Sequence, residues 1–360
     1  MKPIDLNQAE RLLIVKTSSM GDIVHASPVA AALKRAYPHL KIGWVVEDRF
    51  TGVLEGSPCI DRLHQIPYQL IYFRTFSRAA WQAFRSLVRE IRAERYQVAL
   101  DLQGLIKSAI WGALGKVPVR LGGHRMREGT WLFMKRLPIP DLPNQHVVLQ
   151  YLEATRWLGV EQPLPVEFPL FIPEEARQSV RTKLLPLGIT AAFVSMNPSA
   201  GREWKRWHIA NFAELSDRVE AAFGLPVVFV GGPGDKPLEE QLHRLKQHPL
   251  RSLIGRTSIK EVMAVVAQSA VHICGDTGTA HLAAAFGVPC VALYGPTNPD
   301  RTGPFGQRAH VLYKRPMCRR CPPDRCLRRE CLQWITVDEV LQSIADVLQD
   351  ASTYACSFNS

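Results

Sequence analysis

The stretch Arg11-Leu-Leu-Ile-Val-Lys16-Thr-Ser-Ser-Met-Gly21-Asp22 joins an apolar run to a polar turn that contains a glycine. The apolar run predicts a buried strand over residues 11–16, and the amphipathic pattern that follows predicts a helix over residues 23–36. Gly21 lets the backbone turn tightly between them. A strand, a glycine turn and a helix in this order are typical of a parallel α/β sheet, in which ligands bind at the carboxyl ends of the strands.

The same alternation of short apolar runs and amphipathic stretches continues along the chain. It predicts strands over residues 42–46, 98–102, 193–197, 227–230, 271–274 and 290–294. It predicts helices over residues 78–94, 105–114, 146–158, 208–223, 279–286 and 336–348, and a further helix opened by the capping box Ser258-Ile-Lys-Glu261. We therefore expect an α/β fold of two doubly wound parallel-sheet domains that face each other across a cleft.

The chain has 360 residues, of which 46% are hydrophobic and 21% are charged, which is typical of a folded globular protein. A single core rarely grows beyond about 250–300 residues, so two domains are expected. Four prolines between residues 161 and 175 block regular structure and mark the linker. The expected domains are residues 1–170 and 171–335, followed by a helix at 336–349 that packs back towards the first domain and a flexible tail at 350–360.

Lys and Arg exceed Asp and Glu by 11, which favours an anionic partner such as a nucleic acid, a phosphorylated substrate or a membrane surface. Many basic residues lie in the first half of the chain, where they suit an acceptor with phosphate or carboxylate groups, although a solvated charged face explains many of them individually. No stretch approaches the ~18 uncharged apolar residues of a membrane-spanning helix, and the first residues lack the order of a signal peptide. We therefore expect a cytoplasmic protein.

Asp22 is the first candidate catalytic residue. It is expected at a helix start on the carboxyl edge of the sheet, where the positive end of the helix dipole keeps a carboxylate ionised. Such a carboxylate can act as a general base on a bound hydroxyl. The alternative is that Asp22 only caps the helix, and spacing alone favours this simpler role.

A second candidate site is Cys274-Gly-Asp276-Thr-Gly-Thr-Ala-His281, again a strand, a turn and a helix start. Free N–H groups at the helix start and two threonine hydroxyls could hold a diphosphate without a metal ion. The segment is neither a Walker loop nor a Gly-x-Gly-x-x-Gly fingerprint. Ordinary capping by Asp276 or Thr277, with His281 packed or exposed on the first turn, explains the pattern about equally well.

Two further loops carry residues suited to a nucleotide. Residues 197–207 combine Ser199 with Lys205, which could act as a charge clamp on a phosphate. The turn Gly231-Gly-Pro-Gly-Asp235, with Glu239 after it, offers carboxylates for ribose hydroxyls, although a solvated acidic turn is the commoner explanation.

Four cysteines lie within fourteen residues near the C-terminus: Cys318, Cys321, Cys326 and Cys331. Thiolates at such short spacing can close a tetrahedral zinc or iron site, and nearby arginines would lower the pKa values of the thiols. The spacing departs from paired Cys-x2-Cys motifs, so free packed thiols are the favoured alternative.

Together these segments resemble glycosyltransferase family 9, the bacterial heptosyltransferases of lipopolysaccharide inner-core assembly. Residues 14–28, Ile-Val-Lys-Thr-Ser-Ser-Met-Gly-Asp-Ile-Val-His-Ala-Ser-Pro, look like the heptosyltransferase I signature in particular. Further matches follow in consistent order at Asp101-Leu-Gln-Gly-Leu-Ile-Lys-Ser108, Lys205-Arg-Trp207, Gly231-Gly-Pro-Gly-Asp235, Gly275-Asp-Thr-Gly-Thr-Ala-His281 and Gly295-Pro-Thr. The resemblance spans residues 11–345, which makes it far more specific than any one motif.

The resemblance implies a GT-B architecture of two Rossmann-like domains, with the donor sugar nucleotide mostly on the C-terminal domain and the acceptor on the N-terminal one. It implies inverting transfer by direct displacement without an obligatory metal, with Asp22 as the general base and Lys205 as a stabiliser of the leaving diphosphate. The implied donor-binding residues are Ser199, Asp235, Glu239, Asp276, Thr277, Gly278, Thr279 and His281. The implied acceptor-binding residues are Ser19, Met20, Gly21, Arg74, Arg78, Gln103, Lys107 and Arg120.

The implied partners are ADP-heptose and an acidic Kdo-lipid A acceptor at the inner face of the cytoplasmic membrane. We expect a monomer whose attachment to that membrane is peripheral and salt-sensitive. A short cysteine-rich segment recurs in the family with variable spacing, which leaves a structural zinc or iron at this segment open.

Three alternatives predict different behaviour. Another family 9 transferase would use a different acceptor or donor, as in the heptosyltransferase II step. A basic nucleic-acid-binding module with a zinc-bound cysteine cluster would bind oligonucleotides in a salt-dependent way, but no nucleic-acid motif accompanies the charge, so no nucleic acid is expected as a partner. A non-catalytic sugar-nucleotide binder would bind the donor without turnover.

Overall fold

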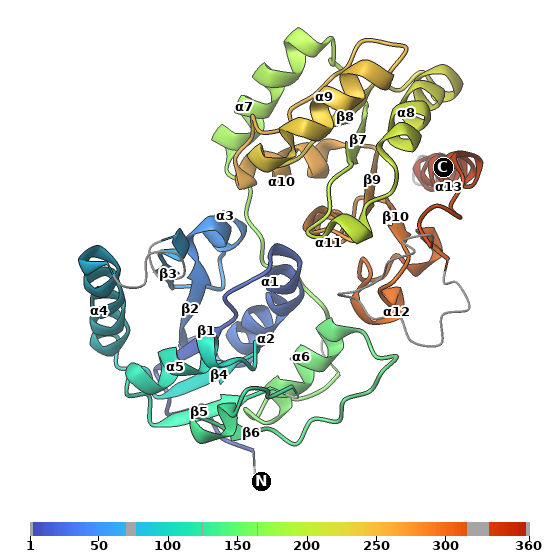
Figure 1. Cartoon of the computed structure of the whole chain (residues 1–360). Helices are drawn as coiled ribbons and strands as arrows, with labels where there is room; N and C mark the ends of the chain where they lie inside the picture. The colour runs from blue at the N-terminus through green and yellow to red at the C-terminus, as the bar shows by residue number, and fades with distance from the viewer. Residues whose placement is uncertain (1–2, 70–76, 124, 164, 315–330, 358–360) are drawn as a thin grey trace. The chain divides into compact units, whose positions relative to one another are not determined.

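The computed structural model describes residues 3–69, 77–123, 125–163, 165–314 and 331–357. It divides into two compact units, Met1–Phe171 and Ile172–Ser360 (Figure 1). Each unit holds one parallel sheet with helices packed on it, which confirms the expected α/β class. The boundary lies among the four prolines, which cannot continue a helix or donate to a sheet.

The sheet of the first unit has, within the described residues, six parallel strands in the order β3-β2-β1-β4-β5-β6. The strands are β1 (Arg11–Val15), β2 (Lys41–Glu47), β3 (Arg62–Ile66), β4 (Val98–Asp101), β5 (Val119–Gly122) and β6 (Lys135–Arg136). In the centre, Leu13 pairs with Gly43 on one side and with Ala99 on the other. Both faces of the central strands are buried, which is why they are continuous apolar runs in the sequence.

Two groups of helices cover this sheet (Figure 1). The helices are α1 (Met20–Ala26), α2 (Pro28–Ala36), α3 (Thr51–Leu54), α4 (Arg78–Ala93), α5 (Ile106–Leu114) and α6 (Val147–Arg156). α4 and α5 pack on each other, and their Leu87, Ile91 and Trp111 share a core with Leu13 and Ala99. α1, α2 and α6 pack together as the second group.

One helix is expected over residues 23–36, but the structure has two. Ser27 ends α1 and begins α2, and Pro28 follows it. Proline has no N–H to continue the hydrogen bonds of α1, whereas its fixed backbone angle suits the first position of a new helix. The chain therefore changes helix at this point.

The sheet of the second unit has five parallel strands in the part of the chain that the structure describes, in the order β11-β10-β9-β7-β8. The strands are β7 (Val194–Asn197), β8 (Val227–Phe229), β9 (Val271–Gly275), β10 (Cys290–Tyr294) and β11 (Val311–Tyr313). The helices are α7 (Glu174–Leu184), α8 (Ile209–Phe223), α9 (Lys236–Leu245), α10 (Ile259–Gln268), α11 (Gly278–Ala285), α12 (Pro299–Thr302) and α13 (Val337–Ser357). The predicted capping box at the start of α10 is present: Ser258 Oγ accepts from the N–H of Glu261 at 3.2 Å, and Glu261 Oε2 accepts from the N–H of Ser258 at 2.7 Å.

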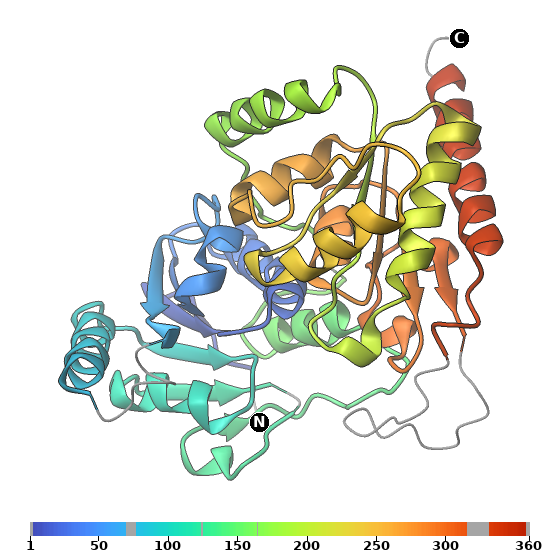
Figure 2. The ribbon, with the colours of Figure 1, turned by 45° about the horizontal axis from the view of Figure 1, so that its top comes forward.

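The last helix, α13, lies beside α8 in both views (Figures 1 and 2). Its Val340, Ile344 and Val347 are buried in the core of the second unit. The helix thus packs on α8 and on the sheet of its own unit, and the expectation that it packs back towards the N-terminal domain stays a prediction. The helix also continues to Ser357, through much of the expected tail, since no glycine or proline ends it there.

Each sheet has one point at which the order of strands reverses. In the first unit β1 lies between β2 and β4, and in the second unit β7 lies between β8 and β9. Connections from two such neighbouring strands leave to opposite faces, which opens a crevice for a ligand at their carboxyl ends. The loops at these crevices are those after β1 and β4 in the first unit, and those after β7 and β9 in the second.

Candidate active site

Asp22 lies in the first turn of α1, a few residues after β1. Its Oδ2 accepts hydrogen bonds from the backbone N–H and the hydroxyl of Ser19, at 3.1 and 2.9 Å. Its Oδ1 lies 3.7 Å from Nζ of Lys16, and 46% of the side chain is exposed. The helix cap expected as the simpler role is therefore present, but it orients the carboxylate without burying it, so a ligand can still reach Asp22.

Lys16, which the sequence pattern did not mark as a site residue, is a buried cation beside Asp22. Its Nζ lies 3.4 Å from the carbonyl oxygen of Leu102 and 5.3 Å from the centre of the Tyr151 ring. Burial alone would lower the pKa of Lys16, but Asp22, Tyr151 and Asp101 together raise it above its ordinary value, so Lys16 is charged at neutral pH. A lysine at the end of an apolar strand is a signal for such a buried ion pair, because buried cations need a partner.

Asp101, at the end of β4, places a second carboxyl near Lys16. It is buried, and its Oδ1 accepts from the N–H groups of Gln103 and Gly104 at 2.7 and 2.8 Å. Burial raises the pKa of Asp101 to about 6, although these N–H groups and Lys16 lower it. The crevice between β1 and β4 thus holds the half-exposed carboxylate of Asp22, the buried cation of Lys16 and the buried carboxyl of Asp101, whose pKa is about 6. Gln103, at the edge of this crevice, is half-buried.

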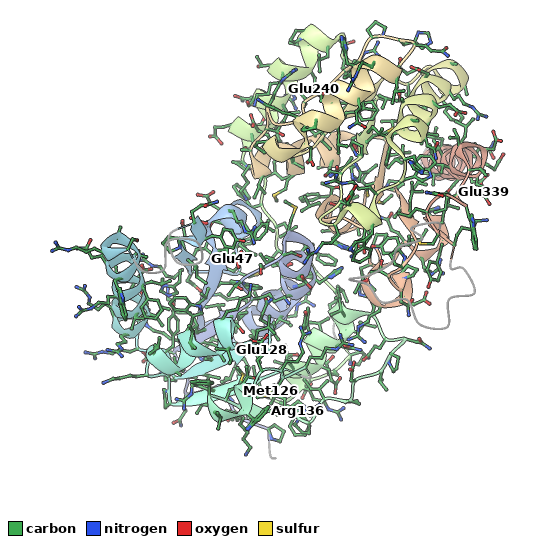
Figure 3. All side chains as sticks on the ribbon, in the orientation of Figure 1. Glu47, Met126, Glu128, Arg136, Glu240 and Glu339 are labelled. Atoms are coloured by element: carbon green, nitrogen blue, oxygen red, sulfur yellow. The ribbon has the colours of Figure 1, made fainter. Side chains whose placement is uncertain are left out.

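Glu47, labelled in Figure 3, joins the acceptor candidate Lys107 to the turn after β1. It ends β2 and is fully buried. Its Oε1 accepts from Nζ of Lys107 at 3.2 Å, and its Oε2 accepts from Arg49 at 2.9 and 2.7 Å. Lys107 also donates to the hydroxyl of Ser18 at 3.1 Å. Two cations held on one buried carboxylate suit the binding of an anionic group, and neither Glu47 nor Arg49 was expected from the sequence.

The remaining acceptor candidates divide into those near this turn and those elsewhere. Ser19, Met20 and Gly21 form the start of α1 beside Asp22. Arg78 is the exposed first residue of α4. Arg120 donates to the carbonyl oxygens of Phe133 and Val117, both at 2.6 Å, so it braces the backbone around β5 and its described contacts do not include the Asp22 turn. Arg74 lies outside the described residues.

In the second unit, the turn after β9 brings Lys205 and Asp276 together. Nζ of Lys205 lies 2.5 Å from Oδ2 of Asp276, which also accepts from the hydroxyl of Thr297 at 2.6 Å. Lys205 belongs to the 3-10 helix η5 (Glu203–Lys205). A Cβ on Gly275 would lie 3.2 Å from the carbonyl oxygen of Lys205, so a glycine lets η5 approach β9 closely. The result is a cation held in place that can exchange its carboxylate partner for a phosphate.

The first turn of α11 lies directly after Asp276, with Thr277 as the N-cap and Gly278 as the first helical residue. The first N–H groups of a helix have no acceptor within it, so this turn could bind an anion, and we call it the α11 anion site. Thr279 and His281 are both buried in this turn. The hydroxyl of Thr279 lies 2.9 Å from Nε2 of His272 and 3.1 Å from Nδ2 of Asn197. This corrects one expectation, because the Thr279 hydroxyl is bound inside the unit and only its N–H is left for a phosphate.

The other donor candidates have local partners. The N–H and the hydroxyl of Ser199 both donate to Oδ1 of Asn197, at 2.9 Å each. Oδ2 of Asp235 accepts from the N–H of Gly232 at 2.8 Å, and Glu239 pairs with Arg256 at 3.2 Å. A role of Asp235 or Glu239 as the ribose ligand stays a prediction.

Three of the four clustered cysteines, Cys318, Cys321 and Cys326, lie outside the described residues, and Cys331 is buried. Elsewhere in the described part of the chain, no group of three or more His, Cys, Asp or Glu side chains is placed to hold a metal ion. The zinc or iron site therefore stays a prediction. No helix among the described residues combines the length and the apolar character needed to cross a membrane.

Comparisons with known proteins identify the family of the chain. The model of glycosyltransferase family 9 (heptosyltransferase) matches residues 84–331. A lipopolysaccharide heptosyltransferase 1 of Pseudomonas aeruginosa is 30% identical over 333 residues, which cover 89% of this chain and 87% of that protein.

Solved structures share the fold of the whole chain. A family 9 glycosyltransferase from Veillonella parvula has a TM-score of 0.82 at 22% identity, covering 95% of this chain and 98% of that one. An E. coli heptosyltransferase solved with ADP has a TM-score of 0.75 at 26% identity, covering 94% and 99%, and it was also solved with ADP-2-deoxy-2-fluoro heptose. The expected GT-B fold is thereby confirmed. The family model over most of the chain and the relative at 30% identity show that the chain is a glycosyltransferase and belongs to family 9, the heptosyltransferases.

Proposed function

We propose that the chain transfers heptose from ADP-heptose to a Kdo residue of Kdo-lipid A in lipopolysaccharide inner-core synthesis, with inversion at the anomeric carbon. The Pseudomonas aeruginosa relative supports a lipopolysaccharide acceptor, and the E. coli structures with ADP and ADP-2-deoxy-2-fluoro heptose support the donor. The observation that carries the proposal is Asp22, a half-exposed carboxylate at the strand-order reversal that Ser19 and Lys16 hold in one orientation.

Asp22 is the general base in this proposal. It takes the proton from the acceptor hydroxyl while that oxygen forms a bond to the anomeric carbon, and the bond from this carbon to the diphosphate breaks. Before the transfer Lys16 is charged, because the carboxylate of Asp22 and the neighbouring Tyr151 and Asp101 raise its pKa, and it orients the Asp22 carboxylate for the proton. Proton transfer to a positioned group of this kind contributes about a hundredfold to ten-thousandfold in rate.

Lys205 and the first turn of α11 receive the leaving ADP. As the phosphate enters, Lys205 exchanges Asp276 for a phosphate oxygen, and the N–H groups of Thr277, Gly278 and Thr279 complete the anion site. Protein cations and N–H groups thus stabilise the charge that develops on the diphosphate. We therefore propose that transfer requires no metal ion.

In this proposal the cations of Lys107 and Arg49 bind the acceptor. Glu47 holds both of them, and Lys107 reaches Ser18 in the turn that leads to Asp22. Kdo is a sugar acid, so its carboxylate is the group that these cations would bind. The acceptor hydroxyl would then lie on the side of the turn where Asp22 is exposed.

We also propose that the protein acts as a monomer bound peripherally to the inner face of the cytoplasmic membrane. In the 3-10 helix η3 (Thr130–Leu132), Trp131 and Leu132 are 67% and 77% exposed. Exposed cations precede and follow them at Arg127, Lys135 and Arg136. Apolar side chains that enter the headgroup layer next to cations that attract anionic lipids support such binding. We call these five residues the η3 surface.

The test is a transfer reaction with purified protein, ADP-heptose and Kdo-lipid A, followed by mass spectrometry and linkage analysis. The expected product carries one additional heptose on Kdo, with release of ADP. A second reaction uses an acceptor that already carries one heptose, and transfer to this acceptor alone would replace the proposal with a heptosyltransferase II step. ADP binding without transfer to either acceptor would replace it with a non-catalytic sugar-nucleotide binder.

A further inference from the structure

A chain of hydrogen-bonded side chains runs behind the anion site of α11. It begins at the carbonyl oxygen of Val266 and ends at Ser199, in the loop that leads to Lys205. Its inner members are at most 6% exposed, so water does not complete their hydrogen bonds. In order, these inner side chains are Ser269, Ser195, His272, Thr279 and Asn197.

The protons at one end of this chain have a single arrangement. The hydroxyl of Ser269 lies 2.7 Å from the carbonyl oxygen of Val266, which can only accept, so Ser269 donates there. Ser195 Oγ lies 2.9 Å from Ser269 Oγ and must supply the proton of that contact. With its proton used, Ser195 can only accept from Nδ1 of His272, at 2.7 Å. His272 therefore carries a proton on Nδ1.

The other end is ordered by a backbone donor. The N–H of Ser199 donates to Oδ1 of Asn197, which turns Nδ2 of the amide towards the Thr279 hydroxyl. Thr279 accepts from Asn197 and lies 2.9 Å from Nε2 of His272. If Nε2 carries no proton, Thr279 donates to it and every contact in the chain holds one proton. Hydroxyls face both ring nitrogens, and burial raises the pKa of the neighbouring Cys274, so that thiol is neutral as well. None of these groups compensates a buried charge, so the neutral form is the one that fits.

We infer that His272, as the neutral imidazole with its proton on Nδ1, is a positioning residue for the donor diphosphate. Its Nε2 holds the Thr279 hydroxyl and thereby fixes the first turn of α11, whose N–H groups face the phosphates. Thr279 holds Asn197, and Asn197 holds both the N–H and the hydroxyl of Ser199. The buried ring of His272 thus positions both the first turn of α11 and the loop of Ser199 that leads to Lys205. The identity of the ligand rests on the proposed function.

Two amide variants separate the two ring nitrogens. The side-chain amide of His272→Gln reaches about as far as Nε2 and can still accept from Thr279, whereas that of His272→Asn ends near Nδ1 and leaves Thr279 without an acceptor. We expect the Kd for ADP, measured by calorimetry, to rise about tenfold in H272N and to stay within about twofold of wild type in H272Q. Ser216→Ala is the matched control, because Ser216 is a buried serine of α8 whose hydroxyl donates to the carbonyl oxygen of Ala213 at 2.8 Å outside this chain, and it should leave the Kd unchanged.

The outcomes distinguish the inference from the proposed function. Equal loss of affinity in H272N and H272Q, or no loss in either, would overturn the positioning role of His272. Binding of ADP to the wild-type protein would leave the proposed function standing in that case. Failure of the wild-type protein to bind ADP would contradict the proposed function instead. Long-range proton–nitrogen correlation spectra of the wild-type histidines apply even where H272N does not fold: His272 should show a bare Nε2, and a proton on Nε2 would refute the inference.

Discussion

Two carboxyl groups of the same sheet edge differ because their surroundings differ. Asp22 is nearly half exposed and is held by Ser19 and Lys16, so it can meet a substrate. Asp101 is buried at the end of β4, where burial raises its pKa to about 6. Lys16 contributes to both environments, because it stays charged and favours the ionised form of each carboxyl. These environments support our proposal that Asp22 takes the proton of the acceptor, whereas Asp101 is held inside the turn after β4.

Asp22→Asn should lower the transfer rate by at least about a hundredfold, because an amide cannot take the proton of the acceptor hydroxyl. The Kd for ADP should be unchanged, since the amide oxygen can still accept from the N–H of Ser19 and maintain the cap. Single-turnover rates and calorimetry measure the two quantities. Asp61→Asn is the matched control, because Asp61 also accepts from a backbone N–H, that of Ile42, and pairs with a lysine, Lys34, both at 2.8 Å. A transfer rate near that of wild type in D22N would remove Asp22 from the base role.

Asp101→Asn should change how the free energy of unfolding depends on pH. The pKa of Asp101 is raised from 3.8 to about 6, so the folded protein keeps a proton that the unfolded chain releases between these values. Ionised Asp101 therefore destabilises the folded state, and stability from this group falls as pH rises from about 4 to about 6. D101N should gain up to about 3 kcal/mol on wild type across this window. Urea titrations at several pH values would measure it, and a constant difference would contradict the prediction.

At the scale of elements, single side chains connect segments that are far apart in sequence. Glu261 caps the start of α10 and also accepts from Lys183 and Ser179 of α7, both at 2.5 Å. Burial by itself would raise the pKa of Glu261, but these donors lower it to about 2. One carboxylate therefore completes a helix start and ties two helices together.

Glu261→Gln should destabilise the protein by about 2–3 kcal/mol at pH 7, because the pKa of Glu261 is lowered from 4.5 to about 2. A lowered pKa gives stability that is present above pH 4.5 and lost as pH falls towards 2, so the difference between E261Q and wild type should shrink over that range. Chemical denaturation across pH measures both effects. Glu214→Gln is the control, since its exposed pair with Arg218 contributes little. Equal destabilisation by both variants would refute the prediction.

The whole molecule carries an excess of 11 positive charges, which attracts anionic surfaces in general. This charge does not specify which face binds the membrane, whereas exposed apolar side chains do. The η3 surface combines both properties, with Trp131 and Leu132 exposed between cations. This arrangement predicts that binding to anionic membranes depends on salt and on the η3 surface.

Changing Trp131 and Leu132 together to alanine should weaken binding to vesicles of anionic phospholipid by about tenfold, because both apolar side chains leave the headgroup layer. Wild-type binding should fall as salt rises and should be weak on phosphatidylcholine vesicles. Co-sedimentation measures each quantity. Leu185→Ala in the second unit is the control, since Leu185 is 59% exposed. An equal loss in this control, or equal binding to neutral vesicles, would reject the η3 surface as the docking face.

The amino-acid pattern is enough to predict the alternation of strands and helices, because buried parallel strands are apolar runs and helices repeat their apolar face. The apolar run predicts β10 to the residue. The pattern also predicts ligand positions in the turns after β1 and β9, because parallel strands end at one edge, and these stay predictions. Short or half-exposed elements, such as β3, β6 and α7, lack a strong apolar pattern and were missed.

Which side chains contact each other depends on how the elements pack. Lys205 contacts Asp276 across 71 positions, and Lys107 contacts Glu47 across 60, and no local pattern encodes such distances. The structure also turned the Thr279 hydroxyl inward to His272, and it paired Lys16 with Asp22 at the end of a buried strand. Periodicity determines which face of an element is buried, whereas the direction of a polar side chain depends on the partners that the packed elements bring to it.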